Sequence, residues 1–229
     1  GTCDRMSPEA PVPVLKQSRV EKKEGMSSNV KLNLESFGVK VNHFHNLETI
    51  KKHRFIDTRY NQHLLRLDEG EDADIEPFDV NVLSGLSQFD AVIISDYDKG
   101  FLPNKVILHM CELFKDKLVF VDSKKQDLSF FSDCIIKVNE KEFNSLTGQP
   151  RDSRFVVTLG EKGAMCNGKI YSTDKTEVFD VCGAGDVFIS SLVYKYMQHG
   201  DMIKAIEFAN KCAAYSVTKF GTYVLTEED

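Results

Sequence analysis

Residues 178–187 read Val-Phe-Asp-Val-Cys-Gly-Ala-Gly-Asp-Val and form the most informative stretch of the chain. A glycine-rich turn here follows a β-prone run and opens an amphipathic segment that ends near His199. At the start of a helix, such a turn points several unpaired backbone N–H groups at one spot, where the helix dipole is also positive. The pattern predicts a site for a phosphate or a developing anion, with Asp186 as the proton acceptor. The alternative is that Asp186 only stabilises the start of the helix.

Upstream of this stretch, short apolar runs alternate with helical patterns, which predicts an α/β fold with a mainly parallel sheet flanked by helices. Asn167-Gly168 has the chemistry of a type I′ hairpin turn. A further strand is expected to lead from a turn at 174–175 into the glycine stretch. Strands are expected at 91–94, 118–121, 135–138 and 155–159, and helices at about 27–37, 104–116, 126–132, 140–147, 184–198 and 201–219.

Two segments nearer the N-terminus are β-prone but charged, and they lack the continuous apolar character of a strand buried on both faces. They predict a small, partly exposed β-sheet lid, with strands at about 8–24 and 52–69. The α/β core is expected over about 25–45 and 80–229, so the chain is predicted to be one domain with a lid.

Composition excludes several classes of protein. A net charge of −6 argues against a nucleic-acid binder, which would carry a basic patch. No apolar run approaches the length of a membrane span, and the N-terminus does not resemble a signal peptide. The six cysteines contain no C-x-x-C pair, which favours buried thiols in a cytoplasmic protein over disulfides or a zinc site. His43 and His45, on a strand-like stretch, have no nearby Cys or carboxylate and are expected to be ordinary surface or half-buried histidines.

Polar residues follow four of the expected strands, at 95–96, 122–124, 139–140 and 158–160. Ligands of open α/β sheets bind beyond the carboxyl ends of the strands, so these residues are expected to lie around a site. The alternative is that they are polar because loops are polar.

Residues 180–186 resemble the D-[TV]-x-G-A-G-D signature of the ribokinase-like (PfkB) carbohydrate kinases. Further segments are similar, in the same order, to the kinase domain of the bifunctional heptose-7-phosphate kinase/heptose-1-phosphate adenylyltransferases. The resemblance implies a ribokinase-like fold and an ATP-dependent transfer of phosphate to a sugar phosphate hydroxyl. The similar segments are 7–14, 59–68, 95–100, 121–124, 139–143 and 208–210.

On this resemblance Asp186 is the catalytic base, and the backbone of Gly183, Ala184 and Gly185 forms the anion hole for the γ-phosphoryl group. Asn139 and Glu142 match an N-x-x-E motif that organises Mg²⁺ and phosphates, although the same spacing also suits a helix-capping pair. Asp180 is expected to tie the loop down or to contribute to a cation site, and a monovalent cation is a further candidate cofactor. The residues expected to bind ATP are Lys124, which an exposed loop lysine would also explain, Asn139, Glu142, Thr158, Gly160, Gly163 and Asn210.

The resemblance also assigns sugar-binding residues, among which Arg59 and Lys99 are the candidates for a substrate phosphate. Each of them could instead be an ordinary polar residue of the protein surface. The full set is Asn29, Arg59, Asn61, Gln62, Arg66, Asp96 and Lys99.

The chain departs from the family mainly on the sugar side. Only six residues precede Ser7, where the family has a core strand, and segments after Val41 and between Gly148 and Phe155 are shortened. The favoured substrate is D-glycero-D-manno-heptose 7-phosphate, and the rivals are another sugar or a non-catalytic nucleotide- or sugar-binding role. A dinucleotide-dependent redox enzyme is disfavoured because no G-x-G-x-x-G follows an early strand.

The lid leads us to expect a homodimer, because an isolated small sheet leaves unpaired edges and one apolar face. The interface is predicted to include residues 10–22 and 54–68. Its apolar face is expected from Val12, Val14, Leu64, Leu65 and Leu67.

Overall fold

The computed structural model describes residues 1–48, 50–83, 88–150 and 152–226. The chain divides into two compact units. We call Gly1–Lys23 with Leu47–Ile75 the hairpin unit, and Glu24–Asn46 with Glu76–Asp229 the core unit. Residues 84–87, 151 and 227–229 of the predicted core range lie outside the described residues. Among the described residues, no helix is both long and apolar enough to cross a bilayer.

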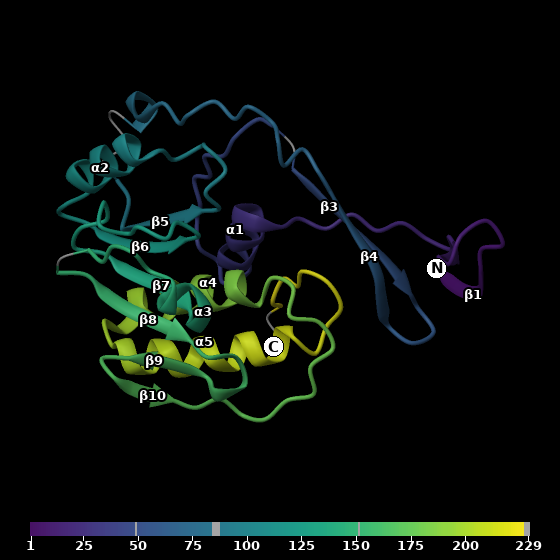
Figure 1. Ribbon diagram of the computed structural model, residues 1–229. Helices are drawn as coiled ribbons and strands as arrows, with labels where there is room; N and C mark the ends of the chain where they lie inside the picture. Colours follow the sequence, from purple (N-terminus) through teal and green to yellow (C-terminus); the bar gives the residue numbers. More distant parts are fainter. Residues whose placement is uncertain (49, 84–87, 151, 227–229) are drawn as a thin grey trace. The chain divides into compact units, whose positions relative to one another are not determined.

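The core unit is built on a six-stranded sheet of order β10-β9-β8-β7-β6-β5 (Figure 1). Strands β5 to β8 are parallel, and β9 and β10 add an antiparallel edge. The predicted mainly parallel sheet is therefore confirmed. The strands are β5 (Ala91–Asp96), β6 (Leu118–Ser123), β7 (Ile135–Asn139), β8 (Arg154–Thr158), β9 (Ala164–Cys166) and β10 (Lys169–Tyr171).

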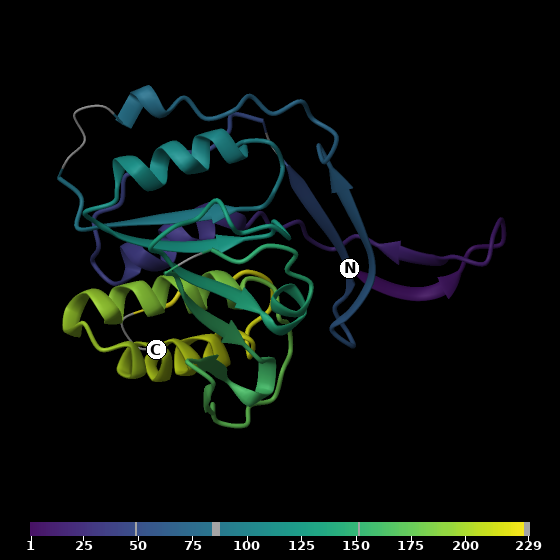
Figure 2. The ribbon, with the colours of Figure 1, turned by 60° about the vertical axis from the view of Figure 1, so that its left-hand side comes forward.

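Helices cover both faces of this sheet (Figure 2). Helices α1 (Met26–Ser36), α4 (Ala184–His199) and α5 (Met202–Ser216) pack on one face, against a buried cluster that includes Phe120 and Ile135. Helix α2 (Asn104–Leu113) and the short α3 (Glu140–Asn144) lie on the other, against Val121 and Ile136. Successive side chains of a buried strand thus pack against helices on opposite faces of the sheet. Every position is buried, and the strands are therefore continuous apolar runs in the sequence. Two 3₁₀ turns complete the unit, η1 (Val80–Leu83) and η2 (Gly160–Lys162).

Three local predictions differ from the structure. The helix expected at 126–132 is absent, because the N–H groups of Leu128 and Thr147 bond to the carbonyls of Gly148 and Gln126 and hold the chain in a turn. The strand expected before the glycine stretch is also absent, since the N–H groups of Phe179 and Asp180 both donate to the Val217 carbonyl instead of a ladder. The stretch around His43 and His45 forms no strand.

The Asn167-Gly168 turn is confirmed. These two residues join β9 to β10 and both have positive φ, 51° and 74°, as a type I′ turn requires.

The hairpin unit holds two antiparallel pairs, β1 (Thr2–Met6) with β2 (Pro13–Lys16), and β3 (Lys51–Asp57) with β4 (Gln62–Glu69). Within the predicted lid range 8–24, only Pro13–Lys16 is strand. Strand β1 was not expected. It is stabilised by pairing with β2, and such pairing cannot be read from the six residues that precede Ser7. Arg59 joins the two hairpins through Asp57 and Asp4.

Candidate active site

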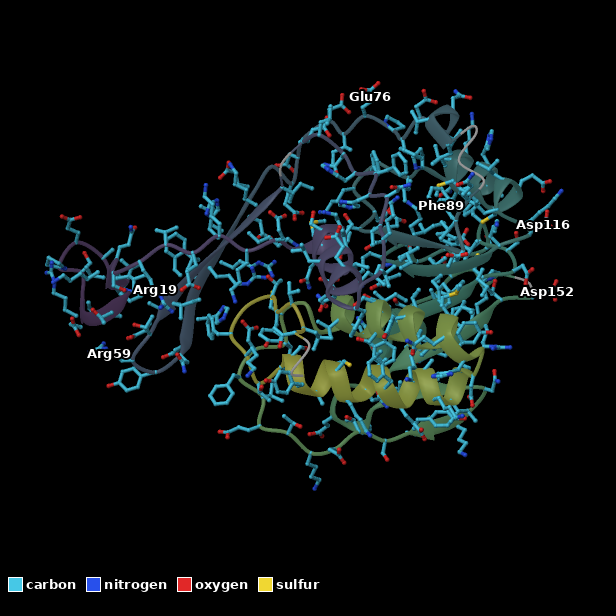
Figure 3. All side chains as sticks on the ribbon, turned by 180° about the vertical axis from the view of Figure 1, so that it is seen from behind. Arg19, Arg59, Glu76, Phe89, Asp116 and Asp152 are labelled. Carbon is cyan, nitrogen blue, oxygen red and sulfur yellow. The ribbon has the colours of Figure 1, made fainter. Side chains whose placement is uncertain are left out.

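Parallel pairing gathers the polar ends of the core strands. Asp122 of β6 is the register partner of Lys137 of β7, and Asn139 is the partner of Thr158 of β8. Phe120 and Ile135 pack toward α4, so Asp122 and Lys137, two residues further along each strand, face the same helix. The amino ends of β6 and β8 lie at the other edge of the sheet. Asp116 and Asp152, which shortly precede these two strands, are labelled at one side of the core in Figure 3.

The glycine loop closes over these strand ends at the start of α4. Gly183 is the N-cap with φ 79°, and a Cβ atom there would lie 2.8 Å from the Asn29 side-chain nitrogen. A Cβ atom on Gly185 would lie 2.8 Å from the Lys137 ammonium nitrogen. A side chain at either position would therefore make Asn29 or Lys137 shift, and the positive φ of Gly183 further favours glycine there. Of the four N–H groups at 183–186, that of Ala184 donates to the Val181 carbonyl and that of Asp186 to the Gly183 carbonyl.

Asp186 is buried, with 9% of its surface exposed, and both carboxylate oxygens are held. Oδ2 accepts from Asn29 Nδ2 at 3.1 Å, and Oδ1 accepts from the Tyr97 hydroxyl at 2.9 Å. Burial raises the pKa of Asp186, against the lowering effect of these two hydrogen bonds. A carboxylate with a raised pKa is better matched to taking a proton near neutral pH.

Tyr97 was not assigned to the site from sequence. Burial and the negative charge of Asp186 raise its pKa, so its hydroxyl stays protonated and donates. The available signal was its position directly after the strand-end residue Asp96, within a segment that already resembled the family.

A chain of alternating charges runs beside the loop. Lys137 Nζ lies 2.7 Å from Asp122, and Lys124 Nζ bridges Asp122 at 3.2 Å and Glu142 at 2.8 Å. Burial acts against the charged form of Asp122, but the nearby Lys137 and Lys124 outweigh it and lower the pKa of this carboxyl. Burial likewise opposes the charge of Lys124, and Asp122 and Glu142 raise the pKa of its ammonium group. Lys124 is thus an exposed lysine that is held by two carboxylates.

Asn139 and Glu142 form the capping box that their spacing allowed. The Glu142 N–H donates to the Asn139 side chain, and the Asn139 N–H donates to the Glu142 carboxylate, both at 2.8 Å. The described residues contain no group of three or more His, Cys, Asp or Glu side chains that could hold a metal ion. Both carboxylate oxygens of Glu142 already have partners, since Oε2 accepts from the Asn139 N–H and Oε1 lies 2.8 Å from Lys124 Nζ.

The other residues expected to bind ATP surround the turn after β8. Gly160 and Gly163 have φ of 61° and 91°, and a Cβ atom on Gly163 would lie 2.1 Å from the Tyr171 carbonyl oxygen. Asn210 is buried and donates to the same carbonyl at 2.8 Å. The Thr158 hydroxyl donates to the Val138 carbonyl.

Asp180 ties down the loop. Its two carboxylate oxygens accept from the N–H groups of Cys182 and Gly221, each at 2.9 Å. The segment after α5 is thereby joined to the turn before α4.

The expected sugar-binding residues fall in both units. In the core unit, Asn29 is fully buried beside Asp186, and Lys99 is half-buried. Asp96 is buried and accepts from the Ser123 hydroxyl at 2.8 Å and from the Asp98 N–H at 2.9 Å, so its oxygens already have partners.

Four of these residues belong to the hairpin unit. Arg59, labelled in Figure 3, is bound to Asp57 and Asp4 within that unit. Asn61 occupies the β3–β4 turn with φ 49°, Gln62 begins β4, and Arg66 pairs with Asp68 at 2.9 Å.

The chain is similar to known proteins over most of its length. The model of the pfkB family carbohydrate kinases matches residues 26–229. The bifunctional protein HldE of Marinomonas sp. (strain MWYL1) is 31% identical over 287 residues, covering 100% of this chain and 59% of the relative. HldE of Campylobacter jejuni (strain RM1221) is 31% identical over 272 residues, covering 96% and 58%. The chain therefore spans less than two thirds of the length of these curated relatives.

Solved structures agree on the fold. Ribokinase from Thermotoga maritima superposes with a TM-score of 0.61 at 16% identity, over 96% of this chain and 89% of the other. Arabidopsis thaliana ribokinase, in complex with ribose and ATP, has a TM-score of 0.53 at 19% identity, over 70% and 60%. The ribokinase-like fold expected from the sequence is confirmed.

Proposed function

This chain belongs to the pfkB family of carbohydrate kinases, and we propose that it transfers the γ-phosphoryl group of ATP to a hydroxyl group of a sugar phosphate. One observation carries the proposal: a buried carboxylate, Asp186, stands in the first turn of a helix that opens with two glycines. The two most specific requirements of phosphoryl transfer, a base for the acceptor hydroxyl and a place for the transferred charge, thereby meet at one loop.

In this proposal Asp186 accepts the proton of the sugar hydroxyl, while Asn29 and Tyr97 orient its two oxygens. The loop at 183–186 and the dipole of α4 stabilise the charge on the transferred group. Lys124 faces the nucleotide phosphates from the end of β6. Mg²⁺, when bound, would neutralise phosphate charge, with Asn139 and Glu142 contacting it through water.

For the acceptor we propose D-glycero-D-manno-heptose 7-phosphate, because the HldE relatives match the chain over nearly its whole length. The candidates for contacting the sugar's phosphate are Lys99 in the core unit and, as a separate candidate, Arg59 in the hairpin unit. Another sugar is the second candidate, since A. thaliana ribokinase binds ribose on the same fold. A role as a non-catalytic binding module is disfavoured because such a module would not need a buried base at position 186.

The test is a panel of sugars and sugar phosphates with ATP, read by ADP release and by the mass of the product. Phosphorylation of the heptose 7-phosphate alone supports the specific assignment, and phosphorylation of another sugar supports the second candidate. Independently, Mg-ATP at roughly 100 times its Kd should stabilise the folded chain by about 2.7 kcal/mol. No shift of the thermal midpoint in millimolar Mg-ATP would contradict the kinase proposal.

We further propose that the chain acts in the cytoplasm, as a homodimer formed through the hairpin unit. Val12, Phe55, Leu65 and Leu67 in that unit are 39% to 61% exposed, and Phe55 is the register partner of Leu65. Val14 and Leu64, also expected in the interface, are half-buried. A second copy would cover this apolar surface.

Analytical ultracentrifugation at tens of micromolar tests the dimer. The unsubstituted chain should sediment as a dimer and Leu65→Glu as a monomer, because a carboxylate placed in an apolar interface must be desolvated. Leu108→Glu, at an exposed leucine of α2, is the matched control and should leave the dimer intact. A monomer for the unsubstituted chain would contradict this proposal.

A further inference from the structure

Lys137 is the only lysine or arginine that is buried among the residues that the structure describes, with 3% of its surface exposed. A buried ammonium group is costly unless it is paired and hydrogen-bonded. Lys137 lies two residues before Asn139 on β7. Its neighbours in the strand, Ile136 and Val138, are apolar and buried in the core. Its ion pair with the buried Asp122 explains one of its hydrogen bonds, and the proposed mechanism gives it no role.

The partners of Lys137 satisfy only part of its bonding capacity. An ammonium group carries three N–H donors, and in the described part of the chain one of them reaches Asp122, at 2.7 Å. That carboxylate is shared with Lys124 at 3.2 Å. The hydrogen-bonding capacity of Lys137 is therefore only partly used by the described residues, although its charge also acts on the carboxylate of Asp186.

The ammonium group points at the anion-binding loop. A Cβ atom built on Gly185 would lie 2.8 Å from Lys137 Nζ, so the ammonium group would have to shift if a side chain stood there. This is also the first turn of α4, the positive end of the helix dipole, where a cation is unfavourable and an anion is favourable. A buried cation at this end of a helix is explained if an anion binds on the other side of the loop.

We propose that Lys137 is the positive charge behind the anion-binding loop, and that it offsets the charge of the terminal phosphoryl group of the nucleotide across Gly185. The inference rests on the proposed kinase function and adds to it a positioning residue from β7. Because the group is shielded from water, its charge acts through a low local dielectric and is screened little by salt. Gly185 then has a second purpose, since any side chain there would displace the ammonium group.

The test compares two nucleotides that differ by the terminal phosphoryl group. Binding of ADP and of β,γ-imido-ATP is measured by calorimetry in magnesium chloride, for the full chain and for Lys137→Gln. Glutamine can still donate a hydrogen bond to Asp122 but carries no charge, so a merely structural role would be rescued. We expect Lys137→Gln to weaken β,γ-imido-ATP about tenfold or more while ADP changes much less.

Two further variants serve as controls. Lys137→Met removes both charge and hydrogen bond and should show the same selective loss. Lys117→Met, at an exposed lysine before β6 at the other end of the sheet, should leave the affinities for both nucleotides unchanged. Should Lys137→Met fail to fold, the Lys137→Gln comparison decides alone.

The outcomes separate the two proposals. Equal weakening of both nucleotides, or no weakening of β,γ-imido-ATP by Lys137→Gln, overturns the role of Lys137 and leaves the kinase proposal standing. If the unsubstituted chain binds neither nucleotide, the proposed function fails and this inference fails with it.

Discussion

The core unit holds a buried ion pair in the candidate site, whereas the Arg66–Asp68 pair of the hairpin unit is largely exposed. The Asp122–Lys137 pair has side-chain exposures of 6% and 4%, while the Arg66–Asp68 pair has 56% and 24%. Buried charges are fixed by their surroundings, and exposed ones are free to reorient. The comparison shows that the Asp122–Lys137 pair is held by its surroundings, whereas the Arg66–Asp68 pair can exchange its partners with water.

The largest expected effect is on the base. Asp186→Asn should lower turnover by roughly 10²–10⁴-fold, which is the usual contribution of a general base. Binding of ATP should persist, because the amide keeps the shape of the carboxylate and the Tyr97 hydroxyl can accept from it. Steady-state kinetics with the phosphorylated sugar, alongside calorimetry with ATP, measures both. Turnover within a few-fold of the unsubstituted enzyme would remove Asp186 from the role of base.

The pH profile of the unsubstituted enzyme sharpens the same point. Because burial raises the pKa of Asp186, the rate should rise with pH along an acidic limb that lies above the ordinary pKa of an aspartate, about 3.9. Below that limb the carboxyl group is protonated and cannot accept a proton. A limb at or below the ordinary value would contradict the raised pKa.

The next largest effect is on the buried ion pair. Asp122→Asn should lower the free energy of unfolding by about 3–5 kcal/mol, because it leaves the ammonium group of Lys137 buried without the carboxylate to which it donates. Urea denaturation followed by circular dichroism measures the loss. An unchanged urea midpoint for Asp122→Asn would show that water reaches the Asp122–Lys137 pair. The pair would then not differ from the exposed Arg66–Asp68 pair of the hairpin unit.

A smaller loss of stability is expected from substituting Gly183 in the glycine loop, and Gly38 provides a matched control. Gly183 and Gly38 have similar positive φ, 79° and 76°, but of these two only Gly183 would bring an added Cβ atom within 4 Å of neighbouring atoms. Gly38→Ala should cost about 1 kcal/mol from backbone strain alone. Gly183→Ala should cost more, since Asn29 must also move. Equal losses in thermal unfolding would show that Asn29 is not held against the loop.

The smallest effect is expected in the hairpin unit. Arg66→Ala removes an exposed ion pair, which contributes little because both charges are hydrated and screened. Its unfolding midpoint should be indistinguishable from that of the unsubstituted chain, whereas its KM for the sugar phosphate should rise if Arg66 contacts the substrate. A clear loss of stability instead would mean that Arg66 has a structural role that the exposed pair does not explain.

Much of the core could be predicted because its signals are local. Continuous apolar runs predicted β5 to β8, Asn167-Gly168 predicted the β9–β10 turn, and the i, i+3 spacing of Asn139 and Glu142 allowed their capping box. The helix expected at 126–132 failed because Leu128 and Phe131 are buried by tertiary contacts that hold a turn. Apolar spacing alone cannot separate those two cases.

Local sequence was enough to place the core strands along the chain, the glycine loop with Asp186, and the polar strand ends. Which of those residues meet was decided by the packing of the folded chain. Tyr97 and Asn29 reach Asp186 across 89 and 157 residues, and Lys137 lies under Gly185 because β7 passes beneath α4. Spacing in sequence carries information about one helix or strand, whereas such contacts depend on how the layers pack, and so they appear only once the chain has folded.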